Sequence, residues 1–195
     1  MIVAIIPARR DSKRLKNKNK LLLHGKPLFL YPIEEAVKSK YIEKIVVTTN
    51  DDDIINSINL MKFDKEITVI RRPEELSQDN SDGMDAVKHV YQTLGLEPEI
   101  TIILQPTSPF RGVDIIDKCI KLLILSQVDS VVTVKESTPH TFYPNGAVCV
   151  FKGYDIWSIN SILLPMDEMG SIDINTEVDF KLSEILMGAK HAKDN

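Results

Sequence analysis

Short apolar runs alternate with segments of helical periodicity along most of the chain. Runs with strand character, rich in Val, Ile and Leu, occupy residues 2–6, 44–49, 67–70, 100–104, 129–134 and 147–151. Apolar residues recur every three or four positions in residues 28–41, 54–61, 81–94, 113–125 and 176–187, which predicts helices. Strands that alternate with helices form right-handed βαβ units, so we predict an α/β fold with a mostly parallel sheet covered on both faces.

Local signals set several boundaries of these elements. Pro7 ends the first strand because proline cannot continue the hydrogen-bonded ladder. Gly95 is placed to end a helix, and Thr176 followed by Asp179 resembles a capping box before the last one. Residues 135–145 are expected to be the least regular part, and residues 188–195 to fray. Because no repeat or linker divides the chain, we predict one domain over residues 1–195.

The first predicted strand leads into a loop that is dense in basic residues. Its basic positions are Arg9, Arg10, Lys13, Arg14, Lys16, Lys18 and Lys20, against one acid, Asp11. The chain has 24 basic and 28 acidic residues and a net charge of −4, so without this loop 17 basic and 27 acidic residues leave −10. Positive charge concentrated in this way argues against general nucleic-acid binding and favours a compact polyanion, a nucleoside triphosphate. The alternative is a solvated charged face.

Composition narrows the class of protein further. With 195 residues, 43% of them hydrophobic, the chain is typical of a globular domain. Cys119 and Cys149 form neither a disulfide framework nor a metal-binding spacing. No segment has the pattern of a signal peptide or a membrane span, so we expect a cytoplasmic protein that does not associate with membranes.

Two loops carry side chains suited to binding a ligand. Gln105, directly after the strand at 100–104, has an amide that can recognise a base or a sugar hydroxyl, although Thr107 or Ser108 can equally make this segment a capped turn. Arg72 can hold a phosphate, but an ion pair with Glu74 or Glu75 is the more ordinary expectation on local grounds.

A third candidate site precedes the last helix. Asp173 and Asn175 point to the same side if the backbone there is extended, because side chains alternate. Two oxygen ligands on one side form a partial Mg²⁺ site that water and substrate phosphates complete. The alternative for Asn175 or Thr176 is helix capping.

Four motifs, taken together and in this order, resemble one protein family. They are Ile-Pro-Ala-Arg with Ser-Lys-Arg-Leu and Lys-Asn in 6–19, Arg-Pro-Glu-Glu-Leu at 72–76, Gln-Pro-Thr-Ser-Pro-Phe-Arg at 105–111, and Ser-Ile-Asp-Ile-Asn-Thr-Glu-Val-Asp-Phe at 171–180. They are similar to the acylneuraminate cytidylyltransferases, the CMP-sialic acid synthetase group. The resemblance implies a three-layer α/β/α nucleotidyltransferase fold of Rossmann-like type. It also implies an enzyme that joins CMP from CTP to a nonulosonic sugar acid with Mg²⁺ and releases pyrophosphate.

The resemblance also implies roles for individual residues. The nucleotide-binding set would be Ala8, Arg9, Lys13, Lys18, Asn19 and Arg72, with Arg9 and Lys18 catalytic. Gln105 and Asn145 would bind the substrate, and Asp173 with Asn175 would bind the metal.

The chain departs from the family pattern in three places. Asn175 replaces a second metal-binding Asp, and Arg10-Asp11 replaces a glycine near Ser12. The segment around 135–145 is short by about thirty residues, where family members carry a functional dimerisation and sugar-site insert. A homodimer is therefore expected to be weakened. These departures keep two alternatives open: a degenerate nucleotide-binding relative with little activity, and a nucleotidyltransferase for another sugar or alditol.

Overall fold

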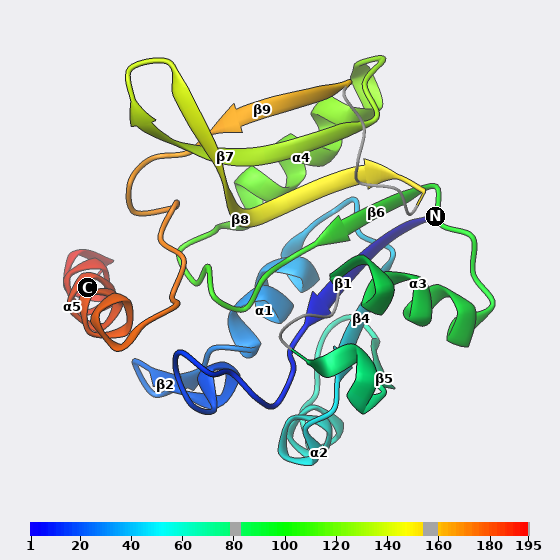
Figure 1. The fold of residues 1–195 in the computed structure, drawn as a ribbon, viewed down its shortest axis with the longest axis horizontal. Helices are drawn as coiled ribbons and strands as arrows, with labels where there is room; N and C mark the ends of the chain where they lie inside the picture. The colour runs from blue at the N-terminus through cyan, green and yellow to red at the C-terminus, as the bar shows by residue number, and fades with distance from the viewer. Residues whose placement is uncertain (79–82, 154–159, 195) are drawn as a thin grey trace.

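A seven-stranded sheet forms the middle layer of the computed structural model, which describes residues 1–78, 83–153 and 160–194 (Figure 1). The strand order is β5–β4–β1–β6–β8–β7–β9. The strands are β1 Ile2–Pro7, β4 Lys44–Thr49, β5 Ile67–Arg71, β6 Ile100–Ile103, β7 Ser130–Thr138, β8 Thr141–Lys152 and β9 Ser161–Pro165. Only β8 runs antiparallel to its neighbours in this described sheet. The predicted mostly parallel sheet is confirmed.

Helices cover both faces of the sheet. Along β1, Ala4 and Ile6 pack in one cluster with residues of α1 Leu30–Lys38, α2 Asp52–Leu60 and α4 Val113–Leu125. Val3 and Ile5 point the other way and pack with residues of α3 Gly83–Leu94. This alternation along one buried strand creates the two cores, and the three-layer α/β/α arrangement is confirmed.

A smaller third cluster attaches the end of the chain to its beginning. The short strands β2 Leu22–Leu23 and β3 Lys26–Pro27 pair with each other beside the short helix η1 Lys18–Lys20. Leu23 and Leu28 pack against Ile174 and against Met187 of α5 Glu177–Asp194. The cluster therefore holds the segment before α5 close to the basic loop. None of the helices in the described residues combines the length and the apolar character that crossing a lipid bilayer requires.

Several predicted boundaries need correction. The segment 135–145 is not irregular: β7 and β8 continue through it as a hairpin with two register shifts, and His140 turns the chain with φ of 69°. The strand β9 was not predicted, and α5 continues to Asp194 where fraying was expected. The predicted helix start at residue 81 lies outside the described residues, and α3 is described from Gly83.

Candidate active site

The backbone after β1 is fixed to the end of β4. The amide of Ala8 donates to the carbonyl of Thr48 at 3.0 Å, and the hydroxyl of Thr49 donates to the carbonyl of Ala8 at 2.5 Å. Ala8 is fully buried. Because β1, β4, β5 and β6 are parallel, their carboxyl ends meet at this edge, the usual position of ligand sites in open α/β sheets.

The basic loop that follows is held from both of its ends. The side-chain amide of Asn19 donates to the carbonyl of Arg9 at 2.8 Å, and Nη1 of Arg9 donates to the carbonyl of Ser77 at 3.2 Å. The backbone of Arg10 donates to Oδ1 of Asn50 at 2.8 Å. These contacts preorganise the cationic side chains instead of leaving them on a free loop.

Two cations of the loop reach the segment before α5. Nη2 of Arg14 and Nζ of Lys18 both donate to Oδ1 of Asn175, at 3.0 and 3.2 Å. Burial lowers the pKa of Lys18, the nearby charges of Arg14 and Arg9 lower it further, and Asp173 opposes the shift. Lys18 is thus a partly buried cation that a further anion would stabilise.

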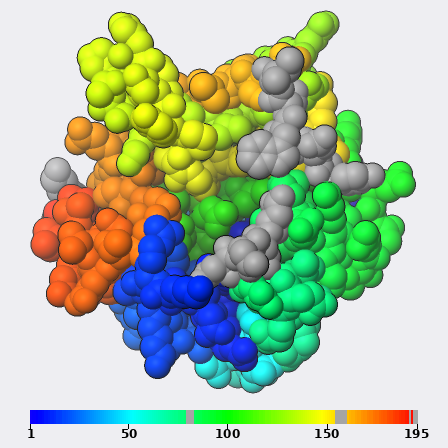
Figure 2. Space-filling view, in the orientation of Figure 1, coloured from blue at the N-terminus to red at the C-terminus, as the bar shows by residue number. Residues whose placement is uncertain are grey.

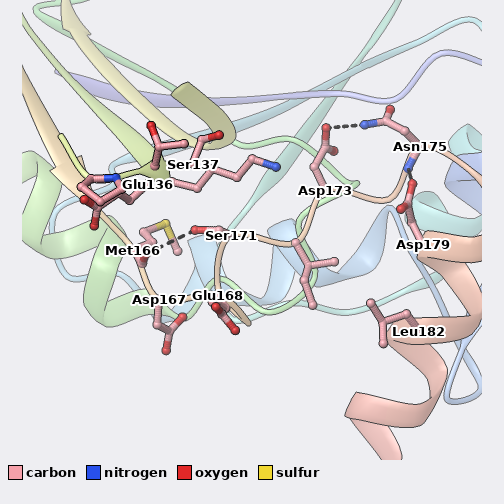
Figure 3. Close-up of a pocket in the computed structure, with 14 residues that line it drawn as sticks. Glu136, Ser137, Met166, Asp167, Glu168, Ser171, Asp173, Asn175, Asp179 and Leu182 are labelled. Carbon is pink, nitrogen blue, oxygen red and sulfur yellow. Dashed lines mark hydrogen bonds between the residues drawn. The ribbon is translucent and has the colours of Figure 1, made fainter. Parts of the chain in front are cut away.

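The segment before α5 displays the predicted same-side arrangement. Nδ2 of Asn175 donates to Oδ2 of Asp173 at 2.5 Å (Figure 3). The predicted capping box is present as well: the backbone of Thr176 donates to Asp179 at 2.7 Å, and the amide of Asp179 donates to the hydroxyl of Thr176 at 3.2 Å. Capping therefore belongs to Thr176 and Asp179, which leaves the side chains of Asp173 and Asn175 directed at the site.

A buried arginine positions the loop after β6. Nη1 of Arg111 donates to the carbonyl of Gln105 at 3.1 Å and to that of Ala147 at 2.6 Å. Only 2% of Arg111 is exposed, and burial lowers its pKa to about 9. The loop and the first buried part of β8 are thereby held together beneath the site.

These groups converge on a cavity of about 290 Å³ at the carboxyl edge of the sheet. Figure 2 shows the surface hollowed between the N-terminal loop, in blue, and the hairpin of β7 and β8, in yellow-green. The predicted site residues that line the cavity are Arg9, Lys18, Asn19, Gln105, Asp173 and Asn175. Predicted side chains from three distant parts of the sequence therefore meet in one place.

Four other predicted residues do not line this cavity: Ala8, Lys13, Arg72 and Asn145. Ala8 lies immediately beneath it, and Lys13 is exposed. Their assignment to the substrates stays a prediction.

Arg72 is buried beneath the edge of the sheet. Its guanidinium donates to the carbonyl of Thr48 at 3.1 Å and to the hydroxyl of Thr48 at 3.4 Å. Of the two expected ion pairs, the one with Glu74 is wrong, because Glu74 contacts Arg10 and Asn50 instead, and the one with Glu75 stays a prediction. Burial lowers the pKa of Arg72 to about 10, and the charge of Arg9 adds to this effect. Arg72 therefore contributes positive potential from below the loop.

Asn145 is buried and its amide is engaged by protein groups. Its Oδ1 accepts from the hydroxyl of Thr133 at 2.7 Å and from the amide of Ala147 at 3.1 Å, and its Nδ2 donates to the hydroxyl of Ser171 at 3.1 Å. It joins the hairpin to the segment before α5.

Sequence reasoning missed several parts of the site. Ser12 and Gly146 line the cavity, and Gly146 has φ of 72°, with the position of an added Cβ only 3.8 Å from Cγ of Gln105. The family resemblance gave a role to Asn145, but the neighbouring Gly146 received none. Arg111 was part of a motif but received no role, because nothing in the sequence shows that an arginine is buried.

Comparison with known proteins shows consistent similarities. A family model described as cytidylyltransferase matches residues 3–156. An N-acylneuraminate cytidylyltransferase from Escherichia coli O18:K1:H7 is 30% identical over 97% of this chain and 53% of its own length. A CMP-N,N′-diacetyllegionaminic acid synthase from Legionella pneumophila is 36% identical over 62% of this chain and 52% of its own length. The chain thus spans about half the length of these two relatives.

The same comparisons bear on length and on fold. The alignment with the E. coli relative extends over 226 positions against 195 residues here, so at least 31 positions face no residue of this chain. The structure of a CMP:2-keto-3-deoxy-manno-octonic acid synthetase in complex with CTP superposes with a TM-score of 0.75 at 15% identity, over 97% of this chain and 99% of the other. At this level of identity the superposition shows a shared fold.

Proposed function

Because the chain belongs to the cytidylyltransferase family, we propose that it transfers CMP from CTP to a nonulosonic, sialic-acid-like sugar acid and releases pyrophosphate. The observation that carries the proposal is the convergence of Arg9, Lys18, Gln105 and Asp173 on one cavity at the carboxyl edge of the sheet. Cations, an amide and a carboxylate in one place suit a triphosphate, a sugar and a metal ion. The partners we propose are therefore CTP and a sugar acid, with neither nucleic acid nor a membrane involved.

The chemistry of such a transfer makes clear demands on the protein. A hydroxyl of the acceptor attacks the α-phosphorus of CTP, a new P–O bond forms, and the bond to the bridging oxygen breaks. Pyrophosphate leaves with that electron pair, and the hydroxyl loses its proton. Catalysis then consists mainly of orienting the two substrates and stabilising negative charge on the leaving group.

Arg9 and Lys18 are the residues best placed for that stabilisation. Both line the cavity, and Asn19 fixes the backbone of Arg9. Burial removes water from the ammonium of Lys18 and thereby lowers its pKa. A nearby phosphate therefore stabilises this ammonium more than it would stabilise an exposed lysine. Gln105, held by Arg111, presents its amide to the acceptor on the other side.

The residues present fit a Mg²⁺ ion that is completed by the substrate. The carboxylate of Asp173 lines the cavity, and Mg²⁺ is commonly held by one or two carboxylates together with phosphate oxygens. Within the described residues no group of three or more His, Cys, Asp or Glu residues is placed to hold a metal ion. Oδ1 of Asn175 accepts from Arg14 and Lys18, so Asn175 can act as a second ligand only if this oxygen gives up these hydrogen bonds and binds the metal instead. When bound, the metal would neutralise charge on the phosphates.

Binding and turnover test the proposal in sequence. Thermal unfolding is measured with CTP, ATP, GTP and UTP, with and without Mg²⁺, since a ligand at about a hundred times its Kd stabilises by ~2.7 kcal/mol. Pyrophosphate release is then measured with CTP, Mg²⁺ and a panel of nonulosonic acids. We expect stabilisation by CTP and release with at least one acid. Stabilisation without release by any acid would instead support the degenerate nucleotide-binding relative, and release only with another sugar or alditol would replace the acceptor class.

A further inference from the structure

A second, larger cavity adjoins the candidate active site. Its volume is about 920 Å³, within the range of sites that hold small molecules, and it shares Asp173 and Asn175 with the first cavity. Its walls come from the hairpin of β7 and β8, the segment after β9, and α5 (Figure 3). A molecule bound there would have one end at Asp173, beside the first cavity.

The charges that line this second cavity are unbalanced. Lys135 is the one cation among its described lining residues. The carboxylates are Glu136, Asp167, Glu168, Asp173 and Asp179. An acceptor carboxylate in this cavity is attracted by Lys135 and repelled by the carboxylates around it.

Most of these carboxylates already have hydrogen-bond donors. Asp179 caps α5, Oδ1 of Asp167 accepts from the amide of Gly170 at 2.6 Å, and Oε1 of Glu136 accepts from the amide of His140 at 3.1 Å. Asp173 accepts from Asn175. Their orientations are therefore fixed by the local backbone or by neighbouring residues. By contrast, the exposed ammonium of Lys135 has neither an ion pair nor a hydrogen bond with any residue that the structure describes.

We propose that Lys135 binds the carboxylate of the acceptor and sets its orientation, while O–H and N–H groups of the acceptor face the surrounding carboxylates. This inference rests on the proposed function and narrows its substrate class. The preferred acceptor has one carboxylate, which lies close to the hydroxyl that receives CMP. The rest of the molecule is rich in hydrogen-bond donors. A second anionic group, such as a phosphate, would lie against carboxylates and weaken binding.

The test is a double-mutant cycle in which one change is made in the protein and one in the ligand, with binding measured by calorimetry. The protein is saturated with Mg²⁺ and α,β-methylene-CTP, whose α–β bridge resists cleavage, and titrated with eight- and nine-carbon 2-keto sugar acids. The tightest acid is compared with its carboxamide in the wild type, in Lys135→Met and in the control Lys152→Met. Lys152 is also an exposed lysine, pairs with Asp129 at 3.9 Å, and lies at the opposite end of β8.

We expect the wild type and Lys152→Met to bind the acid about tenfold more tightly than the amide, and Lys135→Met to bind both equally. An equal preference in Lys135→Met and the wild type would overturn the role of Lys135, as would no binding of any acid. Pyrophosphate release is recorded separately with CTP. If release is absent while the preference behaves as expected, the proposed transfer fails and the role of Lys135 stands. If release occurs and the preference survives in Lys135→Met, only the role of Lys135 fails.

Discussion

Lys18 and Asn175, 157 positions apart in the sequence, are joined by a hydrogen bond of 3.2 Å from the ammonium to the amide oxygen. The same oxygen accepts from Arg14, while the amide nitrogen donates to Asp173. Asn175 therefore stands between the cations of the N-terminal loop and the one carboxylate of the candidate metal site. A neutral residue at this position links both sides without forming an ion pair with either.

Replacing Asn175 by Asp should strengthen metal binding. A second carboxylate beside Asp173 adds one negative charge at the site, and Arg14 and Lys18 offset part of it. We expect the Mg²⁺ concentration that half-saturates the effect on CTP binding to fall about tenfold, or ~1.4 kcal/mol. The measurement is the Mg²⁺ dependence of the CTP thermal shift, with Asn175→Ala as the control without an oxygen ligand. An unchanged midpoint in Asn175→Asp would argue that the metal binds elsewhere.

Replacing Lys18 by Met should abolish most activity and yet stabilise the free protein. In the proposed arrangement Lys18 contacts the leaving phosphates, and loss of one such cation costs about a hundredfold or more in kcat. The pKa of Lys18 is lowered in the folded state, mainly by burial, so charging it there opposes folding at neutral pH. Between the lowered pKa of the folded protein and 10.5, the unfolded chain binds more protons at Lys18 than the folded protein does. Stability therefore rises with pH over this range, and the destabilisation by the buried charge disappears.

Thermal unfolding of both proteins without ligand checks the second half of this prediction. Lys18→Met should have the higher Tm at pH 7, and the difference should shrink towards pH 10. Lys16→Met, which removes an exposed lysine from the same loop, should change neither kcat nor Tm. A Tm for Lys18→Met at or below that of the wild type would show that the contact with Asn175 outweighs the burial of the charge.

The layered fold was predictable because its elements are long and strongly patterned. The β-branched run at 44–49 and the helical spacing at 113–125 match β4 and α4 residue for residue. The last helix shows the limit of this reasoning: its spacing places Val178, Leu182, Ile185 and Leu186 on one face. The first three are 74, 47 and 70% exposed, while Leu186 packs against the third cluster. Phe180 and Met187 pack inward instead. A helix with apolar residues on more than one side leaves the choice to tertiary contacts.

The candidate site was predictable where charge or amide chemistry was visible and not where burial decides. Gln105, Asp173 and the basic loop as a whole could be named because their residue types fit sugar, metal or phosphate, whereas the family resemblance singled out Arg9 and Lys18 within the loop. The bracing role of Arg111 depends on its burial, which a sequence does not display. The regular hairpin at 135–145 was missed because the sequence does not show that its two halves pair: Pro139 lies in the turn between the strands, and Pro144 pairs with Val134.

Replacing Arg111 by Met should destabilise the protein and loosen the loop after β6 that carries Gln105. The change removes the Arg111 donor from the carbonyl of Ala147 and from that of Gln105, which keeps the amide of Ser108 at 3.4 Å, and an unsatisfied buried acceptor costs about 1–3 kcal/mol. Removal of a buried charge offsets part of this, so we expect a net loss of ~2 kcal/mol, or a Tm lower by about 4–8 °C. The KM for the acceptor should rise more than that for CTP, because Gln105 faces the acceptor in the proposed arrangement.

A matched control uses the exposed arginine at the end of β5. Arg71 forms an ion pair with Asp52 in which both side chains are largely exposed. Such pairs contribute about 0–1 kcal/mol, so Arg71→Met should leave Tm and both KM values nearly unchanged. Equal losses in Arg71→Met and Arg111→Met would refute the bracing role of the buried guanidinium.

Replacing Asp179 by Asn tests the junction between α5 and the site. Burial raises the pKa of Asp179, but hydrogen bonds from Asn175 and Thr176 outweigh it and hold the pKa below its ordinary value of 3.8. The ionised carboxylate therefore stabilises the fold above pH 3.8, and this contribution is lost as pH falls through the lowered pKa. At pH 7 the variant should lose about 1 kcal/mol, the usual contribution of a helix cap.

The pH dependence separates this cap from a general effect of the substitution. Urea unfolding of the wild type and Asp179→Asn should give free energies that differ at pH 7 and converge as pH falls below 3.8 and through the lowered pKa, where the folded wild-type carboxyl becomes protonated. Because Asp179 also accepts from the backbone of Asn175 at 2.9 Å, the variant should weaken the Mg²⁺ dependence of CTP binding. Glu177→Gln, in the same helical turn and paired with Lys181 at the surface, should do neither. A constant difference across the pH range would assign the loss to packing and remove the link between the cap of α5 and the site.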